Sequence, residues 1–332
     1  MVSSGSSNVL LSVVIVNYRT PQFVTDCLET LLPEIAGLDA KIVLVDNQSG
    51  DDSVEKISAW LNDHDPEDRV ILIESESNDG FSSGNNIGIK ALKAEYYLLL
   101  NSDTLVRPDS IRILLDTAKK YPDAGLLSPR LEWRDGTGQE SCFRFHQPVG
   151  EFLMSVQTDF FVKRLADKWV PMPVQENIIN PQWTSFACVL IKSEVFEQVG
   201  LLDDGYFMYF EDEAFCFQAM KAGWKILHNP DSRVVHLRGG SSPVKEQSRL
   251  GKRVPRYFYE SRTRFFYQAY GWSGLTLANL CWWAGRLVSK TRQVLGNSAK
   301  GAIDRRWLDI WINWLNPDKP YTHPDPSRNQ VS

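Results

Sequence analysis

Short apolar runs alternate with helical segments through the first part of the chain, and this alternation restricts the fold more than any other feature. The runs are rich in Val, Ile, Leu and Tyr, and they span residues 11–17, 41–46, 70–73, 96–100 and 125–127. Runs this short and this apolar are typical of strands that are buried on both faces of a sheet. Their alternation with helices predicts an α/β fold with a doubly wound, Rossmann-like, mostly parallel sheet.

Acidic or amide residues follow most of these predicted strands. Right-handed crossovers place the carboxyl ends of parallel strands on one edge, and ligands of open α/β sheets bind there. We therefore expect one crevice to be lined by Asn17, Asp46, the polar turn at 78–86, Asn101 and Asp103. Taken alone, Asp103 can equally cap a turn or the helix predicted near Pro108. At the edge of the sheet, its carboxylate can instead hold a divalent cation, which in turn holds a diphosphate.

The alternation ends after Pro129. Asp135-Gly136 predicts a hairpin turn, and the proline-containing stretch 146–182 predicts a long loop with helical pieces that covers a site. The pattern then predicts strands at 188–191, 225–228 and 234–236 and helices at 193–199 and 211–222.

The last third of the chain combines basic residues with many aromatic side chains. The uncharged stretch 271–285 is shorter than the roughly 20 residues that cross a bilayer. Basic residues beside tryptophans are typical of a helix that lies in a membrane interface. Ordinary packing of helices with a solvated basic face is the alternative. We thus predict a flexible N-terminus at 1–10 without a signal peptide, a helical extension at 243–315, and a flexible proline-rich tail at 316–332.

Composition excludes some classes of function and of site. The formal net charge of −5 gives no sign of nucleic-acid binding. Five scattered cysteines without a CxxC pair suit free thiols of a cytoplasmic protein better than a disulfide framework or a zinc site.

Two further groups of residues are candidates for chemistry. Glu211, Asp212 and Glu213 begin a helix directly after an aromatic run. The helix dipole alone can explain acids there, but a carboxylate that aromatic rings partly desolvate is also suited to act as a general base. His236 ends a predicted strand and is a plausible metal ligand, and Arg238 after it can meet phosphate oxygens.

In their order and spacing these segments resemble glycosyltransferase family 2, which has the GT-A fold. The resemblance covers roughly residues 11–242, and its halves would be a nucleotide-binding part at 11–129 and an acceptor and catalytic part at 130–242. The segments that carry it are Ser12–Tyr18, Val45–Ser49 with Asp51, Asn78–Phe81 with Gly84–Asn86, Asn101–Asp103, Phe210–Glu213 and Val235–His236. The pattern around Gly80 and Gly84 is most similar to bacterial rhamnosyltransferases that use dTDP-L-rhamnose in O-antigen or cell-wall synthesis.

The resemblance implies a role for each matching residue. Asp46, with the backbone at Asn17 and Tyr18, would contact the nucleobase, while Asp79 and the glycine turn from Asn78 to Gly80 would lie near the base and ribose. Asn85 and Asn86 would bind the sugar. Asn101, Ser102 and Asp103 occupy the Asp-x-Asp position that binds metal in the family, with an amide in place of the first acid. Asp103 and His236 would then be the ligands of Mg²⁺ or Mn²⁺, and Asp212, next to Glu211, would be the catalytic base.

These roles fit an inverting transfer in which one base deprotonates the acceptor hydroxyl while a diphosphate leaves from the opposite face. We expect a metal-dependent transferase that moves a sugar, L-rhamnose in the favoured case, from a nucleotide-sugar to a saccharide or polyprenyl-diphosphate-linked saccharide. It would be peripheral at the inner face of the cell membrane. A UDP-sugar donor is one alternative. A module that binds nucleotide-sugars or glycans without catalysis is another, motivated by the amide at Asn101.

Overall fold

The structure is a computed structural model that describes residues 8–65, 67–238, 244–296 and 303–325. It consists of two compact units, which are described separately below. The first comprises Met1–Cys142, Pro173–Asp204 and Phe215–Ser241, and the second comprises Phe143–Met172, Gly205–Ala214 and Ser242–Ser332. The predicted boundary at residue 242 stays a prediction, since the second unit also takes in two segments from earlier in the chain.

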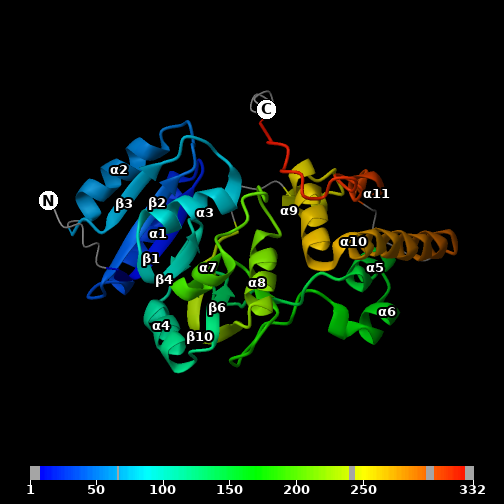
Figure 1. Cartoon of the computed structure of the whole chain (residues 1–332), viewed down its shortest axis with the longest axis horizontal. Coiled ribbons are helices and arrows are strands. Elements are labelled where there is room, and N and C mark those ends of the chain that lie inside the picture. The colour runs from blue at the N-terminus through cyan, green and yellow to red at the C-terminus, as the bar shows by residue number, and fades with distance from the viewer. Residues whose placement is uncertain (1–7, 66, 239–243, 297–302, 326–332) are drawn as a thin grey trace. The chain divides into compact units, whose positions relative to one another are not determined.

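The first unit is built on an eight-stranded sheet (Figure 1), as the alternating pattern predicts. Its strands are β1 (Val9–Asn17), β2 (Ala40–Asp46), β3 (Val70–Glu74), β4 (Ala94–Asn101), β5 (Thr104–Val106), β6 (Ala124–Glu132), β9 (Cys188–Lys192) and β10 (Lys225–His236). The strand order is β3-β2-β1-β4-β9-β6-β10-β5. Two short strands, β7 (Cys142–Phe143) and β8 (Trp183–Thr184), lie outside this sheet.

The sheet is mostly parallel. Strands β1, β2, β3 and β4 pair in parallel, as do β6 and β10. Strand β9 runs antiparallel to both β4 and β6, so β4 and β6 point the same way. The carboxyl ends of β1, β2, β3, β4, β6 and β10 therefore meet at one edge of the sheet, where the sequence predicts the ligand site.

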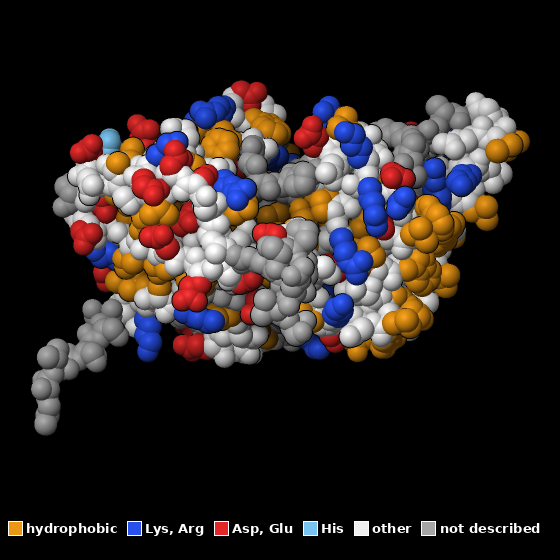
Figure 2. All heavy atoms as spheres, turned by 90° about the horizontal axis from the view of Figure 1, so that it is seen from above, with side chains coloured by type: hydrophobic (Ala, Val, Ile, Leu, Met, Phe, Trp, Pro, Cys, Tyr) orange, Lys and Arg blue, Asp and Glu red, His pale blue; other side chains and the backbone are white. Residues whose placement is uncertain are grey.

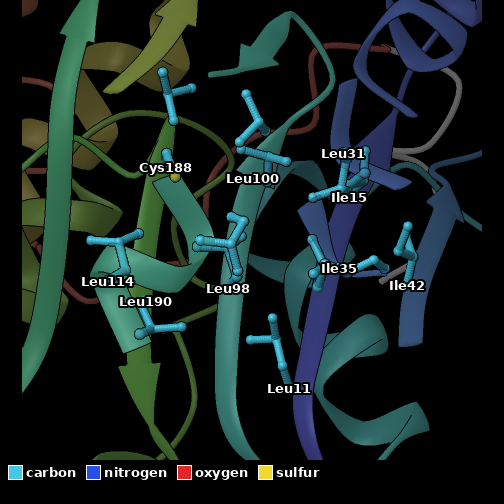
Figure 3. Close-up of a cluster of buried hydrophobic side chains, with 14 of the residues drawn as sticks. Leu11, Ile15, Leu31, Ile35, Ile42, Leu98, Leu100, Leu114, Cys188 and Leu190 are labelled. Atoms are coloured by element: carbon cyan, nitrogen blue, oxygen red, sulfur yellow. The ribbon is translucent and has the colours of Figure 1, made fainter. Parts of the chain in front are cut away.

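Helices of the first unit pack on the sheet through apolar faces. They are α1 (Pro21–Glu34), α2 (Ser53–His64), α3 (Gly80–Ala91), α4 (Ser110–Lys120) and α7 (Ser193–Val199). Figure 3 shows the centre of the core, where Leu11, Ile15 and Leu98 of the strands meet Leu31 of α1 and Leu114 of α4. Because these side chains are fully or almost fully buried, they fix the position of the strand ends that carry the polar residues.

The second unit is helical. It contains α5 (Pro148–Val156), α6 (Asp159–Arg164), the 3₁₀ turn η1 (Ala166–Lys168), α9 (Val244–Arg249), α10 (Arg256–Val294), α11 (Arg306–Asp309) and the first residues of α8 (Glu211–Lys221). Helix α10 is kinked at Gly271, whose φ of 67° lies in the left-handed region. Glycine enters that region without a steric penalty, so the chain can change direction there. Helices α5 and α6 lie within the stretch that we predicted as a loop with helical pieces.

A buried ionic group lies inside the second unit. Arg262 of α10 pairs with Glu151 of α5 at 3.3 Å and donates to Asn279 Oδ1 at 2.8 Å, and both charged side chains are 1% exposed. Pairing is what makes buried charges tolerable, and removal of one partner is strongly destabilising. The group thereby connects both arms of α10 to α5.

Two predictions about elements need correction. The strands predicted at 225–228 and 234–236 are one strand, β10, with an irregular register between Asn229 and Arg233. The polar turn predicted at 78–86 is shorter, because α3 already begins at Gly80. Among the described residues, no helix is both long enough and apolar enough to cross a membrane.

Candidate functional site

Asp46 is the centre of a buried hydrogen-bond cluster at the ends of β1 and β2. Its Oδ1 accepts a bond from Asn17 Nδ2 at 2.7 Å and one from the Ser49 hydroxyl at 2.6 Å, and its Oδ2 accepts one from the Ser49 backbone N–H at 2.9 Å. Asp46 is 3% exposed and Asn17 is fully buried. Hydrogen bonds to a carboxylate are among the strong ones, so this cluster holds the turn after β2 in one conformation. Tyr18, partly exposed beside it, carries the Arg19 guanidinium 5.0 Å from its ring centroid.

Asn47 connects this cluster to the turn after β3. Its Nδ2 donates to Asn78 Oδ1 and to the Gly80 carbonyl, both at 3.0 Å. Asp79 accepts a short hydrogen bond from the Ser77 hydroxyl in the same turn. The residues predicted to contact base and ribose, Asp46 on one side and Asn78 to Gly80 on the other, are thus brought together at the sheet edge.

The glycines of α3 serve close packing on the sheet. A Cβ added at Gly88 would lie 2.4 Å from Val14 Cγ1, and one at Gly84 would lie 2.9 Å from Val16 Cγ1. Helix α3 can therefore lie this close to β1 only because glycines recur every four residues. The sequence pattern that resembles the family's donor turn has this packing function in addition to any contact with a ligand.

Asn85 and Asn86 are both buried within α3, and their amides have protein partners. Asn86 Nδ2 donates to the Leu202 carbonyl at 2.7 Å, and Asn86 Oδ1 accepts from the Leu202 backbone N–H at 3.1 Å. Asn85 Nδ2 donates to the Phe81 carbonyl at 2.9 Å. Asn86 thus anchors the segment that contains Leu202, a role that the sequence did not indicate, and the predicted contact of both residues with a sugar stays a prediction.

The turn between β4 and β5 carries the candidate metal ligand. Asn101 ends β4, and its carbonyl accepts a hydrogen bond of 2.7 Å from the Thr104 hydroxyl, which closes the turn. The Ser102 and Thr20 hydroxyls lie 3.4 Å apart, and Asp103 is partly exposed. The short strand β5, which the sequence analysis did not predict, pairs antiparallel with β10.

This pairing brings His236 to Asp103. Thr104 of β5 is opposite His236 of β10, and His236 Nε2 lies 3.4 Å from Asp103 Oδ1. The two side chains are 11% and 15% exposed. Two ligands of one octahedral ion, each ~2.1 Å from it, lie ~3 Å apart, so the pair fits a shared divalent cation. Among the described residues His236 Nδ1 has no hydrogen-bond partner. The polar contact of the ring is therefore made by Nε2.

The protein supplies few ligands for such an ion. Within the described ranges, no group of three or more His, Cys, Asp or Glu residues is arranged to hold a metal. A cation at Asp103 and His236 would therefore take its remaining ligands from water and from a substrate, as Mg²⁺ commonly does at phosphate sites.

Arg238 is held beside this pair by Gln139, a residue that the sequence analysis missed. The Arg238 guanidinium donates a short hydrogen bond to Gln139 Oε1 and lies 5.6 Å from the ring centroid of the half-exposed Trp133. Gln139 Nε2 in turn donates to the His236 carbonyl at 2.7 Å. Partial burial lowers the pKa of the Arg238 guanidinium, which stays charged because the ordinary pKa of this group lies far above neutral pH. No sequence motif marked Gln139, since its role depends on the pairing of β6 with β10.

The second unit holds the candidate base. Asp212 is partly exposed, whereas its neighbours Glu211 and Glu213 are 8% and 1% exposed. Burial, and then the adjacent Asp212 charge, raise the pKa of the Glu211 carboxyl well above its ordinary value. Glu211 Oε2 has no hydrogen-bond partner among the described residues. Of the two predicted catalytic acids, Asp212 is thus the one whose exposure lets it reach a ligand.

Glu213 forms a pair with His146 that the sequence analysis did not predict. Glu213 Oε2 lies 2.6 Å from His146 Nδ1, and Glu213 Oε1 accepts a bond from the His146 backbone N–H at 2.5 Å. Burial of His146 opposes protonation, but the charge and hydrogen bond of Glu213 outweigh it and raise the pKa of the imidazole. The pair ties the start of α8 to residues just before α5.

One group of predicted site residues lies together in the first unit, whereas the predicted catalytic acids lie in the second unit. Asn17, Tyr18, Asp46, the turn at 78–80, Asn101 to Asp103, His236 and Arg238 all belong to the first unit and lie at or just beyond the strand ends at its edge. Asp212 and Glu211 belong to the second unit. Their approach to Asp103 stays a prediction. From the sequence we also expect Lys245 to meet phosphate oxygens and the glycines after Arg238 to let the backbone approach a ligand, but this side chain and these residues lie outside the described part.

Comparisons with known proteins show which family and which relatives the chain resembles. Residues 12–166 match the model of Glycosyl transferase family 2. A low-salt glycan biosynthesis hexosyltransferase of Haloferax volcanii is 31% identical over 216 residues, which are 64% of this chain and 62% of that protein. An N-acetylglucosaminyl-diphospho-decaprenol L-rhamnosyltransferase of Mycobacterium tuberculosis is 29% identical over 160 residues, 47% of this chain and 51% of that protein. Both matches thus span less than two thirds of the relative.

Solved structures share the fold at low sequence identity. A mannosyltransferase from Pyrobaculum calidifontis, solved with GDP-Man and Mn²⁺, has a TM-score of 0.53 and 13% identity, and the match covers 98% of this chain and 88% of that one. GalNAc-T7, solved with UDP, GalNAc and Mn²⁺, has a TM-score of 0.55 and 16% identity, with 93% and 58% covered. The sequence matches show that residues 12–166 resemble glycosyl transferase family 2, and the mostly parallel α/β sheet and the solved structures show that the chain has the GT-A fold.

Proposed function

We propose that this chain is an inverting, metal-dependent glycosyltransferase that moves a sugar from a nucleotide-sugar to a glycan acceptor. The observation that carries the proposal is the 3.4 Å approach of His236 Nε2 to Asp103 Oδ1, at the same sheet edge as the Asp46 cluster. A nucleotide-sugar has a base, a diphosphate and a sugar in a row. A site for it needs polar groups for the base and charged groups for the diphosphate, and this edge carries the Asp46 cluster and the Asp103–His236 pair.

Each part of the donor has a proposed partner in the first unit. The base contacts Asp46 and the backbone at Asn17 and Tyr18, and the ribose lies near Asp79. Asp103 and His236 hold Mg²⁺ or Mn²⁺, which when bound stabilises the negative charge that develops on the leaving diphosphate. Arg238, braced by Gln139, contacts phosphate oxygens, for which a guanidinium is well suited.

The second unit supplies the base in this proposal. Asp212 accepts the proton of the acceptor hydroxyl as that oxygen attacks the anomeric carbon. One displacement without an enzyme nucleophile inverts the configuration at that carbon. Glu211 is buried, so it is less suited to contact an acceptor hydroxyl and instead shapes the turn that presents Asp212.

The favoured donor is dTDP-L-rhamnose, and the favoured acceptor is a saccharide on a polyprenyl diphosphate. The support is the mycobacterial relative, which is an N-acetylglucosaminyl-diphospho-decaprenol L-rhamnosyltransferase. The name of the second relative, a hexosyltransferase of glycan biosynthesis, agrees with a role in surface glycan synthesis. A lipid-linked acceptor would place the protein at the inner face of the cell membrane as a peripheral protein.

A donor screen tests this proposal. Purified protein with Mn²⁺ or Mg²⁺ is titrated with dTDP, UDP and GDP, and its Tm is followed. A ligand that binds only the folded state at 100 times its Kd stabilises that state by about 2.7 kcal/mol. We expect the largest metal-dependent rise of Tm with dTDP. A larger rise with UDP would instead identify a UDP-sugar donor. This donor is the alternative, because GalNAc-T7, which has a similar fold, was solved with UDP and Mn²⁺.

The replacement of Asp212 by Asn tests the catalytic assignment. The Asp212→Asn variant should bind the donor nucleotide like the wild type but lose turnover by a factor of about 10²–10⁴, the usual contribution of a general base. Turnover near the wild-type rate would remove Asp212 from the mechanism.

A non-catalytic module that binds nucleotide-sugars or glycans is the second candidate. The observation that favours it is Asn101 at the position of the first acid of the motif, together with the absence of a third His, Cys, Asp or Glu ligand among the described residues. Transfer or hydrolysis of any nucleotide-sugar by the wild type, lost in Asp212→Asn, would exclude this candidate.

A further inference from the structure

Large exposed hydrophobic side chains are concentrated in one part of the second unit. Of the fifteen such residues found in the described part of the chain, ten lie between Trp272 and Leu315. They are Trp272, Leu277, Leu280, Trp283, Leu287, Val294, Leu295, Trp307, Leu308 and Leu315. Figure 2 shows hydrophobic and basic side chains gathered over the region where Figure 1 draws α10 and α11. Single exposed hydrophobics are normal, but such a concentration indicates an interaction site.

The arm of α10 after Gly271 carries apolar side chains on its exposed face as well as on its buried face. At 100° per residue, five of the exposed side chains fall within an arc of ~80°, namely Trp272, Leu280, Trp283, Leu287 and Val294. The opposite face carries Leu275, Trp282 and Ser289, which are buried in the unit. A helix face that contacts water normally carries polar residues, so these exposed apolar side chains are unusual.

Helix α11 extends the same surface. The rings of Trp283 and Trp307 lie 6.1 Å apart, and Leu308 follows with 50% exposure. We call Trp272, Leu280, Trp283, Leu287 and Trp307 the outer face. Leu287 is 68% exposed, so a substitution there removes little packing within the unit.

Basic residues border the outer face, and acids are nearly absent. No Asp or Glu occurs between Ser261 and Gly296, and at 100° per residue Lys290 lies within the arc of the outer face and Arg286 lies beside it. Next to Trp307, the acid Asp304 is exposed, while Asp309 is 3% exposed and paired with Arg253. The charge at this surface is therefore positive although the whole chain has a net charge of −5.

We propose that the outer face docks on an anionic lipid bilayer, with its Trp and Leu side chains at the boundary of headgroups and acyl chains. Tryptophan is enriched at that boundary, and lysine and arginine are attracted to anionic lipid headgroups. A second copy of this chain would bury the apolar side chains too, but it would bring equal positive charges together. The charge of the surface therefore favours lipid over self-association. This docking does not depend on the donor or on the transfer reaction.

Vesicle flotation with the full chain tests the proposal. Vesicles of phosphatidylcholine alone are compared with vesicles that also contain phosphatidylglycerol, each at low and high salt. We expect binding to the anionic vesicles, and about tenfold weaker binding for Leu287→Gln, because one buried leucine contributes about 1.5 kcal/mol or more. We also expect a clear loss for Lys290→Glu, because each basic residue near the surface contributes about 1 kcal/mol.

Matched controls come from exposed residues of the first unit. Ile178→Gln removes an exposed apolar side chain and Lys119→Glu reverses an exposed charge, and neither should change binding. Equal binding to neutral and anionic vesicles, or no binding to either, would overturn the proposal. A dimer in sedimentation that Leu287→Gln dissociates would show that a second copy covers the face, and would overturn it as well. The Tm rise with dTDP and Mn²⁺, measured on the same preparations, reports on the donor site separately.

Discussion

His236 Nε2 lies 3.4 Å from Asp103 Oδ1 because β5 pairs with β10 and places Thr104 opposite His236. The two residues lie far apart in the sequence, and both side chains are largely buried. A turn cap would need only the carboxylate. In our proposal the imidazole and the carboxylate share a divalent cation, and this can be tested directly.

The first prediction concerns this pair. Asp103→Asn should abolish the additional Tm rise that Mn²⁺ gives to the protein with dTDP, since an amide is a much weaker ligand than a carboxylate. His236→Gln should weaken the Mn²⁺ dependence about 10- to 100-fold in metal concentration. Asp109→Asn is the matched control, because Asp109 is exposed and lies at the start of α4. If Asp103→Asn responds to Mn²⁺ like the control, the metal is held elsewhere.

The second prediction concerns the Asp46 cluster. Asp46→Asn turns an acceptor-only group into one that also donates, opposite the donors Asn17 Nδ2 and Ser49 N–H. We expect a loss of about 1–3 kcal/mol in the free energy of unfolding. Donor binding should be lost as well, measured by calorimetry at a temperature where the variant is folded.

Ser49→Ala separates orientation from contact in the same cluster. The Ser49 hydroxyl lies 2.6 Å from Asp46 Oδ1 and itself accepts from the Arg19 N–H at 2.9 Å. The variant keeps the carboxylate but frees it to turn, so dTDP binding should weaken by about tenfold or less. Unchanged binding in both variants would mean that Asp46 has a purely structural role.

The third prediction uses the raised pKa of Glu211. Because burial and the Asp212 charge raise that pKa in the folded state, the folded protein binds a proton that the unfolded chain releases above its ordinary pKa of about 4.5. The contribution of Glu211 to stability therefore falls as the pH rises above about 4.5. Glu211→Gln removes this loss, so it should be more stable than the wild type at pH 7 and not at pH 4, as measured by chemical denaturation. A stability difference that does not change with pH would contradict the assignment.

The edge of the sheet could be predicted from sequence because it depends on local patterns. A buried strand reads as a short apolar run, and the residue that ends it is visible directly, as with Asn17, Asp46 and Asn101. The parallel crossovers then bring these ends together, whatever the details of the helices. This is why the fold class and the polar residues at these strand ends could be predicted, while the roles of these residues stay predictions.

The remaining features depend on long-range pairing, which a single sequence does not display. Strand β9 enters the sheet antiparallel between β4 and β6, and β5 is only three residues long, so neither has a distinct pattern. Gln139 and the Asn86 contact with Leu202 follow from such pairings. Helix α10 reads as a continuous helical pattern, and its change of direction is visible only in the positive φ of Gly271.

The fourth prediction concerns the His146–Glu213 pair, which also links segments far apart in sequence. Glu213 raises the pKa of the His146 imidazole in the folded state, despite the burial that opposes it. A base whose pKa is raised by folding contributes stability below its unfolded pKa of about 6.5, and the contribution is lost as the pH rises through the folded pKa. His146→Gln should therefore lower the free energy of unfolding more at pH 5.5 than at pH 9.

His228 provides a control of opposite sign for this prediction. Burial, and then the Arg130 charge, lower its pKa to about 4, so the unfolded chain binds a proton between pH 4 and about 6.5 that the folded protein excludes. We compare the free energy of unfolding of the wild type with that of each variant. From pH 5 to pH 8, the wild type should become more stable relative to His228→Gln and less stable relative to His146→Gln. Chemical denaturation of both variants and the wild type across this range measures the two trends. Trends of the same sign would show that Glu213 does not hold a protonated His146, and that the start of α8 is positioned by packing alone.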